Sequence, residues 1–363
     1  MKRNDFHIAV MPGDGIGVEV MEAAIAVLEA VEKRHGFAVS RELVAGGAQH
    51  YRAHGVAMTE AAFARAEKVD AILFGAMGWP EIRYPDGTEI APQLDLRFRL
   101  NLYAGVRPIR AIPGVPLALA SPRAKEIDLV ILRESTEGMF ASRGKGTVID
   151  DQEARDTQVI TRATTERLTR FAFRLAERRQ VKRGRPGRVT LVDKANVFLS
   201  FAFMRKVFYE TAREFPGIQA AHHYVDAMAL DLVRRPWDFD VLPMENLFGD
   251  ILSDLGAGLI GGMGFAPSAD VGDAHALFQP SHGSAPDIAG QGIANPTAMI
   301  LSTALMLEWL GERSGSQAAR DAASDIERAV DRAFATGRIR TRDVGGSDGT
   351  AATTKAVIEA LGG

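Results

Sequence analysis

Short apolar runs alternate with longer amphipathic segments along most of the chain, and this alternation predicts an α/β protein. The first apolar run, 8–11, ends in a glycine-containing turn at 12–17 and leads into a helix that we expect to reach about Arg34. Further strand-length runs lie at 70–74, 128–132, 189–192 and 240–244. Segments with helical length lie near 163–181, 196–214, 247–260, 295–312 and 318–336.

Polar and charged residues recur where the predicted strands stop. Arg133 and Glu134 follow one run, Asp193 and Lys194 follow another, and 245–246 (Glu-Asn) follows a third. In open α/β sheets, ligands bind at the carboxyl ends of the strands. We therefore expect a functional site at this edge.

Two segments depart from the α/β pattern. Residues 141–161 are polar and β-prone without a helical period, which suggests an arm or hairpin used for subunit contact. The basic run 182–188 contains Gly and Pro, and we interpret it as a solvated connection between elements rather than a binding patch. No segment has the length of a flexible linker, so two lobes interleaved along the chain are expected.

Composition narrows the class of protein. A chain of 363 residues with 46% apolar and 25% charged residues is typical of a soluble globular protein with more than one lobe. A net charge of −3 argues against nucleic-acid binding, and the lack of cysteine excludes disulfides, thiolate metal sites and thiol nucleophiles. No apolar stretch of about 18 residues is present to cross a membrane, and no signal-peptide core follows the N-terminus. A cytoplasmic protein is expected.

Asp250 and Asp254 are the most informative pair of residues. Their spacing is close to one helical turn, so both carboxylates project from one face of the helix predicted at 247–260. Ile251, Leu252 and Leu255 are expected to pack the opposite side. Two anions held this close favour a hard divalent cation such as Mg²⁺ or Mn²⁺. The alternative, acidic residues placed near a helix start to match its dipole, is about equally probable for this pair alone.

Cationic side chains lie at other predicted element ends. Arg97, Arg107 and Arg133 have the planar guanidinium that binds carboxylates in two places, and together they suit a substrate with two carboxylates. Lys194 follows a buried strand, where a nearby metal and arginines would disfavour its ammonium form and allow it to act as a base. Asp226 offers a third carboxylate.

Glycines and small residues form two candidate nucleotide loops. The turn at 13–17 resembles a dinucleotide fingerprint, but Val18 occupies the position of its third glycine, so we interpret this turn as a tight strand-to-helix connection. The loop 281–290, followed by Asn295 and Pro296, allows backbone amides to approach a phosphate closely.

Taken in order, these motifs resemble the metal-dependent β-decarboxylating dehydrogenases, which include isopropylmalate, isocitrate, homoisocitrate and tartrate/D-malate dehydrogenases. The run 246–265, the sequence His-Gly-Ser-Ala-Pro-Asp at 282–287, Asp-Lys-Ala-Asn-Val at 193–197 and the arginine spacing carry the resemblance, which covers essentially the whole chain. It implies an isopropylmalate dehydrogenase-like fold. Residues 1–102 and 257–363 would form the larger, cofactor-side lobe, and 103–256 the smaller lobe with the dimer interface and the arm.

The resemblance also implies roles for the site residues. Arg97, Arg107 and Arg133 would hold the malate moiety. Asp250, Asp254 and, from the other subunit of a homodimer, Asp226 would bind Mg²⁺ or Mn²⁺. Lys194, also donated across the dimer, would accept the hydroxyl proton, and K⁺ is left open as an activator. The cofactor would lie against His282, Gly283, Ser284, Ala285, Asp287, Ile288 and Asn295.

Asp287 and Ile288 bear on the choice of cofactor. A carboxylate accepts hydrogen bonds from both ribose hydroxyls and repels a 2′-phosphate, and NADP-using relatives place lysine and tyrosine at these positions. The prediction is NAD⁺.

Two positions depart from the family pattern. Phe140 stands where the family has its catalytic tyrosine, so the usual donor of a proton to the enolate is missing and decarboxylation is in question. Gln93 and Leu94 precede Arg97, where isopropylmalate enzymes place leucines around the alkyl branch. We therefore expect a D-malate- or tartrate-like substrate first, 3-isopropylmalate or another 3-alkylmalate second, and isocitrate third.

Two rival functions remain at this point. A non-catalytic regulatory subunit would be expected to lose the metal carboxylates or the lysine. A hydroxythreonine-phosphate-type dehydrogenase would bind its metal through histidines, whereas this chain offers aspartates.

Overall fold

The computed structural model describes residues 3–362, and the chain divides into two compact α/β units. Unit 1 comprises Met1–Asn101, Ala111–Ala118 and Ile260–Gly363, and unit 2 comprises Leu102–Arg110 and Leu119–Leu259. The predicted α/β class is confirmed. Residues 111–118 group with unit 1, whereas the sequence-based division placed them in the smaller lobe.

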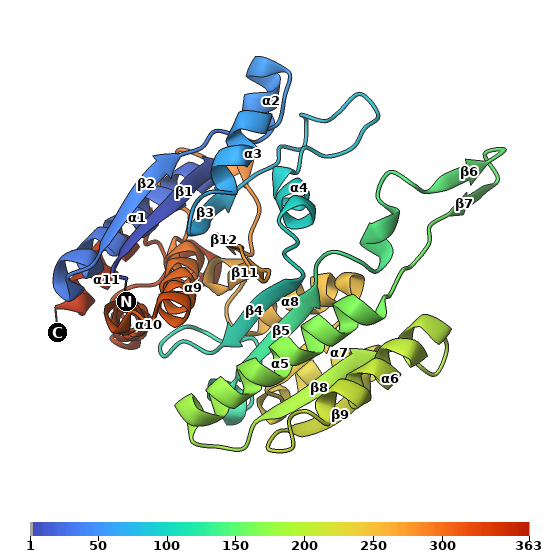
Figure 1. Cartoon of the computed structure of the whole chain (residues 1–363). Helices are drawn as coiled ribbons and strands as arrows, with labels where there is room; N and C mark the ends of the chain where they lie inside the picture. The colour runs from blue at the N-terminus through green and yellow to red at the C-terminus, as the bar shows by residue number, and fades with distance from the viewer. Residues whose placement is uncertain (1–2, 363) are drawn as a thin grey trace. The chain divides into compact units, whose positions relative to one another are not determined.

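Unit 1 contains five neighbouring strands in the order β2-β1-β3-β12-β11 (Figure 1). Parallel pairs join β1 (Asp5–Gly13) to β2 (Ala38–Leu43) and β3 (Ala71–Ala76), and β12 (Ala276–Pro280) to β3. β11 (Pro267–Val271) runs antiparallel to β12. All residues of β3, β11 and β12 are buried, so these strands lie in the core of the unit.

Helices cover this sheet. α9 (Thr297–Ser314) is buried over most of its length because it packs on β3, β11 and β12 and also on α1 (Gly17–His35) and α10 (Gln317–Ala335). α11 (Thr350–Leu361) packs against α1 and α10. The shorter helices of the unit are α2 (Ala48–His54), α3 (Glu60–Ala66) and α4 (Pro92–Arg99).

Unit 2 repeats the α/β theme with the order β4-β5-β10-β8-β9. β5 (Asp128–Glu134), β10 (Val241–Met244), β8 (Arg188–Asp193) and β9 (Gln219–Tyr224) are parallel, and β4 (Ala104–Arg110) is antiparallel to β5. The carboxyl ends of the four parallel strands therefore share one edge, as the strand-end residues predicted. Helices α5 (Arg162–Arg183), α6 (Leu199–Ala212), α7 (Val225–Arg234) and α8 (Asn246–Leu259) complete the unit.

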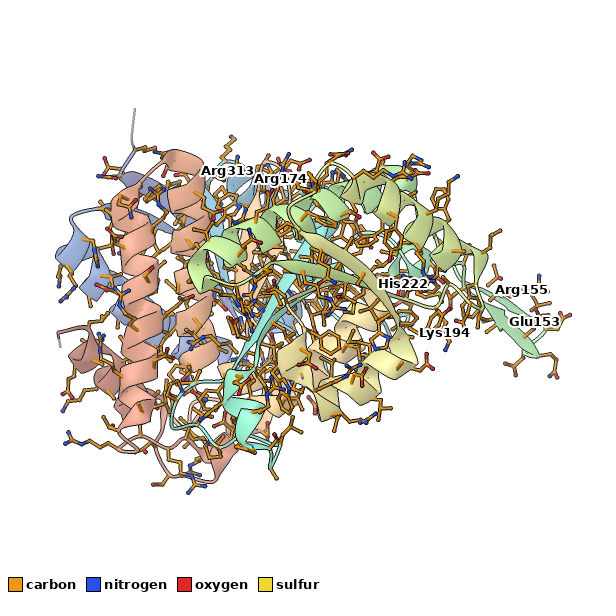
Figure 2. All side chains as sticks on the ribbon, turned by 90° about the horizontal axis from the view of Figure 1, so that it is seen from below. Glu153, Arg155, Arg174, Lys194, His222 and Arg313 are labelled. Atoms are coloured by element: carbon orange, nitrogen blue, oxygen red, sulfur yellow. The ribbon has the colours of Figure 1, made fainter. Side chains whose placement is uncertain are left out.

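The expected arm is a two-stranded antiparallel hairpin of β6 (Thr147–Ile149) and β7 (Glu153–Arg155). Every residue of the two strands is exposed, and the hairpin extends away from the helices of its unit (Figure 1). Glu153 and Arg155 lie near its far end (Figure 2).

The interpretation of 182–188 as a solvated connection is only partly right. α5 continues to Arg183 and stops at Gly184, whose left-handed conformation caps the helix. Arg183 is not solvated, because its side chain, 11% exposed, pairs with Asp128 and Asp240.

Candidate active site

Arg133, at the carboxyl end of β5, is fixed by two residues of α8. Its side chain is 5% exposed; Nε donates to Asn246 Oδ1 at 2.8 Å, and Nη1 donates to the carboxylate of Asp250. Gly249 makes this approach possible, because a Cβ there would lie 2.6 Å from the Cβ of Arg133. A substrate-type arginine and a metal-type aspartate therefore lie side by side at the predicted edge.

Asp254 lies one turn further along α8 and has no hydrogen bond or ion pair among residues 3–362. Removal from water raises the pKa of its carboxyl, and the negative charge of Asp250 raises it further, while Arg107 and Arg133 lower it. Arg107, on β4, is buried, and its Nη1 donates to the carbonyl of Val106 at 3.3 Å. A divalent cation would stabilise this arrangement, in which the negative charge of one carboxylate disfavours the ionisation of its neighbour.

Lys194 and Asp226 form a separate pair. Lys194 Nζ donates to Asp226 Oδ1 at 2.5 Å, and this bond lowers the pKa of Asp226. The preceding Asp193 is fully buried and is held by Arg205 (Nη2 to Oδ1, 2.6 Å), which fixes the end of β8. Figure 2 shows Lys194 at the end of unit 2 from which the hairpin extends.

One chain does not assemble all three metal-type acids. Among the described residues, no group of three His, Asp or Glu side chains lies close enough to hold a metal ion. Asp226 pairs with Lys194 instead of joining Asp250 and Asp254. His222 and His223 have structural contacts, with Tyr209 and Asp231 respectively.

The outer faces of α7 and α8 carry exposed apolar side chains. Ile251 is 60% exposed, so the expectation that it packs inward is wrong; Leu252 is buried. The reason is helical geometry, since Gly249, Leu252 and Gly256 face the strands and Ile251 follows Asp250 on the outer side. The other exposed apolar residues here are Leu230, Val233 and Leu247.

In unit 1, Arg97 on α4 is buried and oriented by Asp270. Its Nε donates to Asp270 Oδ2 at 3.0 Å, and Gln279 Nε2 donates to the same oxygen at 3.0 Å. The terminal nitrogens of Arg97 make no hydrogen bond within 3–362, which leaves them available for a carboxylate. Gln93 lies one turn earlier on α4, and its Oε1 is buried without a hydrogen-bond partner; Leu94, beside it, is half-buried.

The glycine turn of unit 1 contacts the second candidate loop. Ile16 N donates to Ser284 O at 2.8 Å, and a Cβ at Gly15 would lie 2.0 Å from that oxygen. Ser284 Oγ in turn donates to the carbonyl of Gly78 at 2.5 Å. The interpretation of the turn as a tight connection fits these contacts, because its open side is filled by the loop that contains Gly283, Ser284 and Ala285.

On either side of this contact, the loop carries polar atoms that have no hydrogen-bond partner among the described residues. The carboxylate of Asp287 is exposed and has no partner among the described residues, and Ile288 beside it is half-buried. His282 Nδ1 donates to Gly283 O at 2.9 Å, which leaves Nε2 as a buried acceptor with no partner. Burial lowers the pKa of His282 more than Asp343 raises it, so the ring is neutral.

Asn295 is held on both sides of its amide. Oδ1 accepts from Thr297 N (3.0 Å) and Thr297 Oγ1 (2.7 Å), and Nδ2 donates to Asp343 Oδ2 at 2.9 Å. The loop from Ser281 to Asn295 therefore combines an available carboxylate, an acceptor and an oriented amide.

A sequence model of the isocitrate/isopropylmalate dehydrogenase family matches residues 7–361. The chain belongs to this dehydrogenase family. The family predicted from the motifs is therefore confirmed, and its members are decarboxylating hydroxyacid dehydrogenases that require a nicotinamide cofactor and a divalent metal.

Individual relatives agree over nearly the full length. The chain is 43% identical to the 3-isopropylmalate/3-methylmalate dehydrogenase of Methanocaldococcus jannaschii, with 94% of each chain covered. It is 38% identical to the tartrate dehydrogenase/decarboxylase of Pseudomonas putida, with 99% of each covered. Among solved structures, isocitrate dehydrogenase from Methylococcus capsulatus matches with a TM-score of 0.86 and 38% identity over 98% of this chain and 99% of that one.

Phe140, at which the motif resemblance places a tyrosine in the family, lies close to Arg133. It lies in a short helix, η2 (Met139–Ser142), and the Arg133 guanidinium stands 4.9 Å from the centre of its ring. Glu245 fixes this turn by accepting from Met139 N at 3.1 Å. The ring therefore borders the Arg133 guanidinium but has no proton to give.

Several residues that sequence reasoning missed hold the site in place. Glu245 and Asn246 were noted only as polar residues after a strand; the first caps α8 by accepting from Leu247 N at 3.0 Å, and the second orients Arg133. Asp270 and Asp343 were not singled out at all. Each acts on a residue far away in the sequence, which leaves no local signal.

No helix within 3–362 combines the length and apolarity that a bilayer span requires.

Proposed function

We propose that this chain oxidises a (2R)-malate-type hydroxy diacid with NAD⁺ and a divalent cation, with decarboxylation, as a homodimer with shared active sites. The contact between Arg133 and Asp250, with Asp254 next to them, is the observation that carries the proposal. It brings a carboxylate-binding cation and two metal-binding anions to one strand end.

The donor set fits the cation. Asp250 is 48% exposed, and Asp254 has no hydrogen-bond or ion-pair partner among residues 3–362. Carboxylate oxygens are the ligands that Mg²⁺ and Mn²⁺ prefer. Asp226 of a second copy would complete the set, since one chain brings together only two of the three acids.

Dimerisation is supported by the exposed side chains Leu230, Val233, Leu247 and Ile251. An apolar surface of this kind on α7 and α8 needs a partner, and it borders Asp226 in sequence on one helix and Asp250 on the other. A second copy packed there would bring its Lys194 and Asp226 to the acids of the first.

The proposed reaction assigns each step to residues of the chain. Arg97, Arg107 and Arg133 bind the two carboxylates and fix the C2 hydrogen relative to the cofactor. Lys194 accepts the proton of the C2 hydroxyl as hydride leaves C2. The bond from C3 to its carboxylate then breaks, CO₂ departs, and the electron pair forms an enolate that takes a proton at C3. When bound, NAD⁺ accepts the hydride, and the cation supplies positive charge beside the developing ketone and enolate.

The cofactor proposal rests on Asp287. Its unpaired carboxylate is suited to two ribose hydroxyls and would repel a 2′-phosphate. We therefore infer NAD⁺ in preference to NADP⁺, with K⁺ as a variable to be tested.

For the substrate, the names of the relatives favour a 3-alkylmalate, with the 3-isopropylmalate/3-methylmalate enzyme among the most similar. This is the first candidate. A second candidate, tartrate, is favoured by Gln93, whose buried Oε1 lacks a hydrogen-bond donor among the described residues that the C3 hydroxyl of tartrate would supply. D-malate has only hydrogens at C3 and is the unbranched member of the same substrate class.

A substrate panel tests the proposal. We expect NADH from purified protein with NAD⁺, Mn²⁺ and at least one of 3-isopropylmalate, 3-methylmalate, D-malate, tartrate and isocitrate, with and without K⁺. Gln93→Leu should raise the ratio of kcat/KM for 3-isopropylmalate over tartrate. No NADH with any substrate would favour a regulatory subunit.

Phe140 is tested by measuring CO₂ and NADH together. Because Phe140 has no hydroxyl to protonate the enolate, we expect less than one CO₂ per NADH, and Phe140→Tyr should raise the ratio. A wild-type ratio of one would show that another group or water donates the proton efficiently.

A further inference from the structure

The side-chain amide of Asn295 is fixed more firmly than its position in a loop would require. Its oxygen accepts two hydrogen bonds from Thr297, and one of its two N–H groups donates to Asp343. The hydrogen-bond network thereby assigns oxygen and nitrogen of the amide. The second N–H has no acceptor among the described residues, so it is available to a ligand.

Asp343 is itself held in a structured turn. It lies in η6 (Arg342–Val344), and Thr341, which is fully buried, donates its hydroxyl to the second carboxylate oxygen of Asp343. The turn is closed by Gly346 N, which donates to Thr341 O at 2.9 Å. Both carboxylate oxygens of Asp343 are therefore committed, one to its own turn and one to Asn295.

Gly264 leaves room for this contact. A Cβ at that position would lie 2.3 Å from Asp343 Oδ2 and 2.9 Å from Asn295 Nδ2. Any side chain here would separate the two groups, so the glycine, the acid and the amide form one arrangement contributed by three segments of unit 1.

The charge of Asp343 also acts on His282, where it partly offsets the effect of burial on the ring. His282 presents an unpaired acceptor at Nε2, and Asn295 presents an unpaired donor. An adenine ring offers the matching set, an amino group that donates and ring nitrogens that accept.

We propose that Asp343 is a positioning residue for the adenosine half of the dinucleotide. It acts by holding the Asn295 amide so that its second N–H faces the base. This inference rests on the proposed NAD⁺ site, and it adds a residue that the sequence motifs did not mark. Without Asp343, only the two hydrogen bonds from Thr297 would restrain the rotation of the Asn295 side-chain amide.

The test measures nucleotide binding by calorimetry rather than turnover. For Asp343→Ala, we expect the Kd values for NAD⁺ and for ADP-ribose to rise together by about tenfold, the loss that follows when a charge-assisted hydrogen bond no longer orients a binding group. Asp343→Asn keeps an acceptor and the side-chain size. Its Kd values should therefore lie about halfway between those of wild type and Asp343→Ala on a logarithmic scale. In kinetics, KM for NAD⁺ should rise while kcat changes little.

A matched control comes from the same loop. Asp348 is also an acid, but its carboxylate accepts from Arg340 N at 2.7 Å and does not contact Asn295. Asp348→Ala should leave both nucleotide affinities within twofold of wild type. The increase in melting temperature caused by Mn²⁺, which reports on acids in unit 2, should be unchanged in all three variants.

The outcomes separate the possible failures. Unchanged affinities in Asp343→Ala, or equal losses in Asp343→Ala and Asp348→Ala, would overturn the positioning role while leaving the NAD⁺ site intact. Wild-type protein that binds neither NAD⁺ nor ADP-ribose would remove the proposed cofactor site itself and the positioning role with it. Should Asp343→Ala unfold, the Asp343→Asn comparison carries the same test.

Discussion

The two ends of the parallel strands in unit 2 are both rich in charged residues, but these residues are paired within the chain to different extents. At the amino ends, Arg179 and Arg183 of α5 each pair with both Asp128 and Asp240. Arg179 Nε lies 2.7 Å from Asp240 Oδ1, and its Nη2 lies 2.9 Å from Asp128 Oδ1. Two positive and two negative groups thus satisfy one another within the chain.

At the carboxyl ends the acids are left incompletely satisfied. Asp250 has one arginine partner and is 48% exposed, while Asp254 has a raised pKa and no hydrogen bond or ion pair in the part of the chain that the structure describes. Lys194 and Asp226 pair at the surface, with the Asp226 side chain 67% exposed. This end therefore has binding capacity that the folded chain does not use.

The difference separates charge that serves stability from charge that serves function. Paired charges such as those of Arg179 and Asp240 neutralise one another and gain little from an added ion. A carboxylate whose pKa is raised by burial and by a neighbouring acid, as in Asp254, gains from a cation. Substitutions at the two ends should consequently have opposite profiles of activity and stability.

The largest contrast is expected for Asp250→Asn. Loss of a metal ligand should lower kcat/KM on the order of 10⁴-fold, about 5 kcal/mol of transition-state stabilisation. The melting temperature should change less than in the control described next, because the amide oxygen still accepts a hydrogen bond from Arg133. The matched control at the amino ends is Asp128→Asn, which should lower the melting temperature and keep kcat/KM of the folded enzyme. Parallel measurement of NADH formation and thermal unfolding checks both, and equal activity losses would erase the distinction.

Arg179→Leu tests the other end. The side chain of Asp240 is 8% exposed, so removing one of its two arginine partners leaves a buried charge poorly compensated. We expect a loss of about 4 kcal/mol in the free energy of unfolding, measured by denaturant titration. Arg174→Leu, on the same helix but outside the network, should cost far less. Activity per folded molecule should persist in both variants.

Glu134 sharpens the comparison because it is a buried acid without a cation. Burial raises its pKa from 4.5 to about 7, despite hydrogen bonds from Thr136 and from Glu137 N. A carboxyl group whose pKa is raised on folding contributes stability that is fully present below the pKa of the unfolded state. This stability is lost as the pH rises through about 7. The shift corresponds to roughly 3 kcal/mol between pH 4.5 and 8.

Denaturant midpoints at pH 5 and pH 8 check this expectation. Glu134→Gln cannot titrate, so its stability should vary less with pH, although its amide places a nitrogen where an accepting oxygen stood. The change in slope is therefore the informative quantity, and identical slopes in the two proteins would contradict the raised pKa.

Sequence patterns predicted those parts of the fold and site whose signals are local. The strands β1, β3, β5, β8 and β10 were anticipated because each is a short apolar run followed by turn or polar residues. β11 and β12 were not, because they are buried on both faces and contain polar residues, including Ser268, Asp270 and Gln279, that resemble a loop. Their polarity is explained only by contacts such as Arg97 to Asp270.

The candidate site shows the same division between local signals and contacts that are remote in sequence. Asp250 and Asp254 were recognised because helical spacing places them together, and Arg133 because it ends a strand. Their supporting residues were missed, since Asn246 and Asp343 act on partners remote in sequence. The exposure of Ile251 was also mispredicted, because one chain's sequence does not distinguish a core face from a face that awaits a partner.

Asp254→Asn gives the smallest and most selective prediction. The ionised carboxyl of Asp254 is disfavoured by burial and by Asp250, so at pH 7 its removal should stabilise the metal-free protein, by less than about 1 kcal/mol because solvent screens the partly exposed group. The same substitution should abolish the increase in melting temperature caused by Mn²⁺. Asp238→Asn, at the amino ends of the strands, should retain that increase. A variant that loses stability without metal, or keeps the Mn²⁺ response, would place the cation elsewhere and end the contrast between the two strand ends.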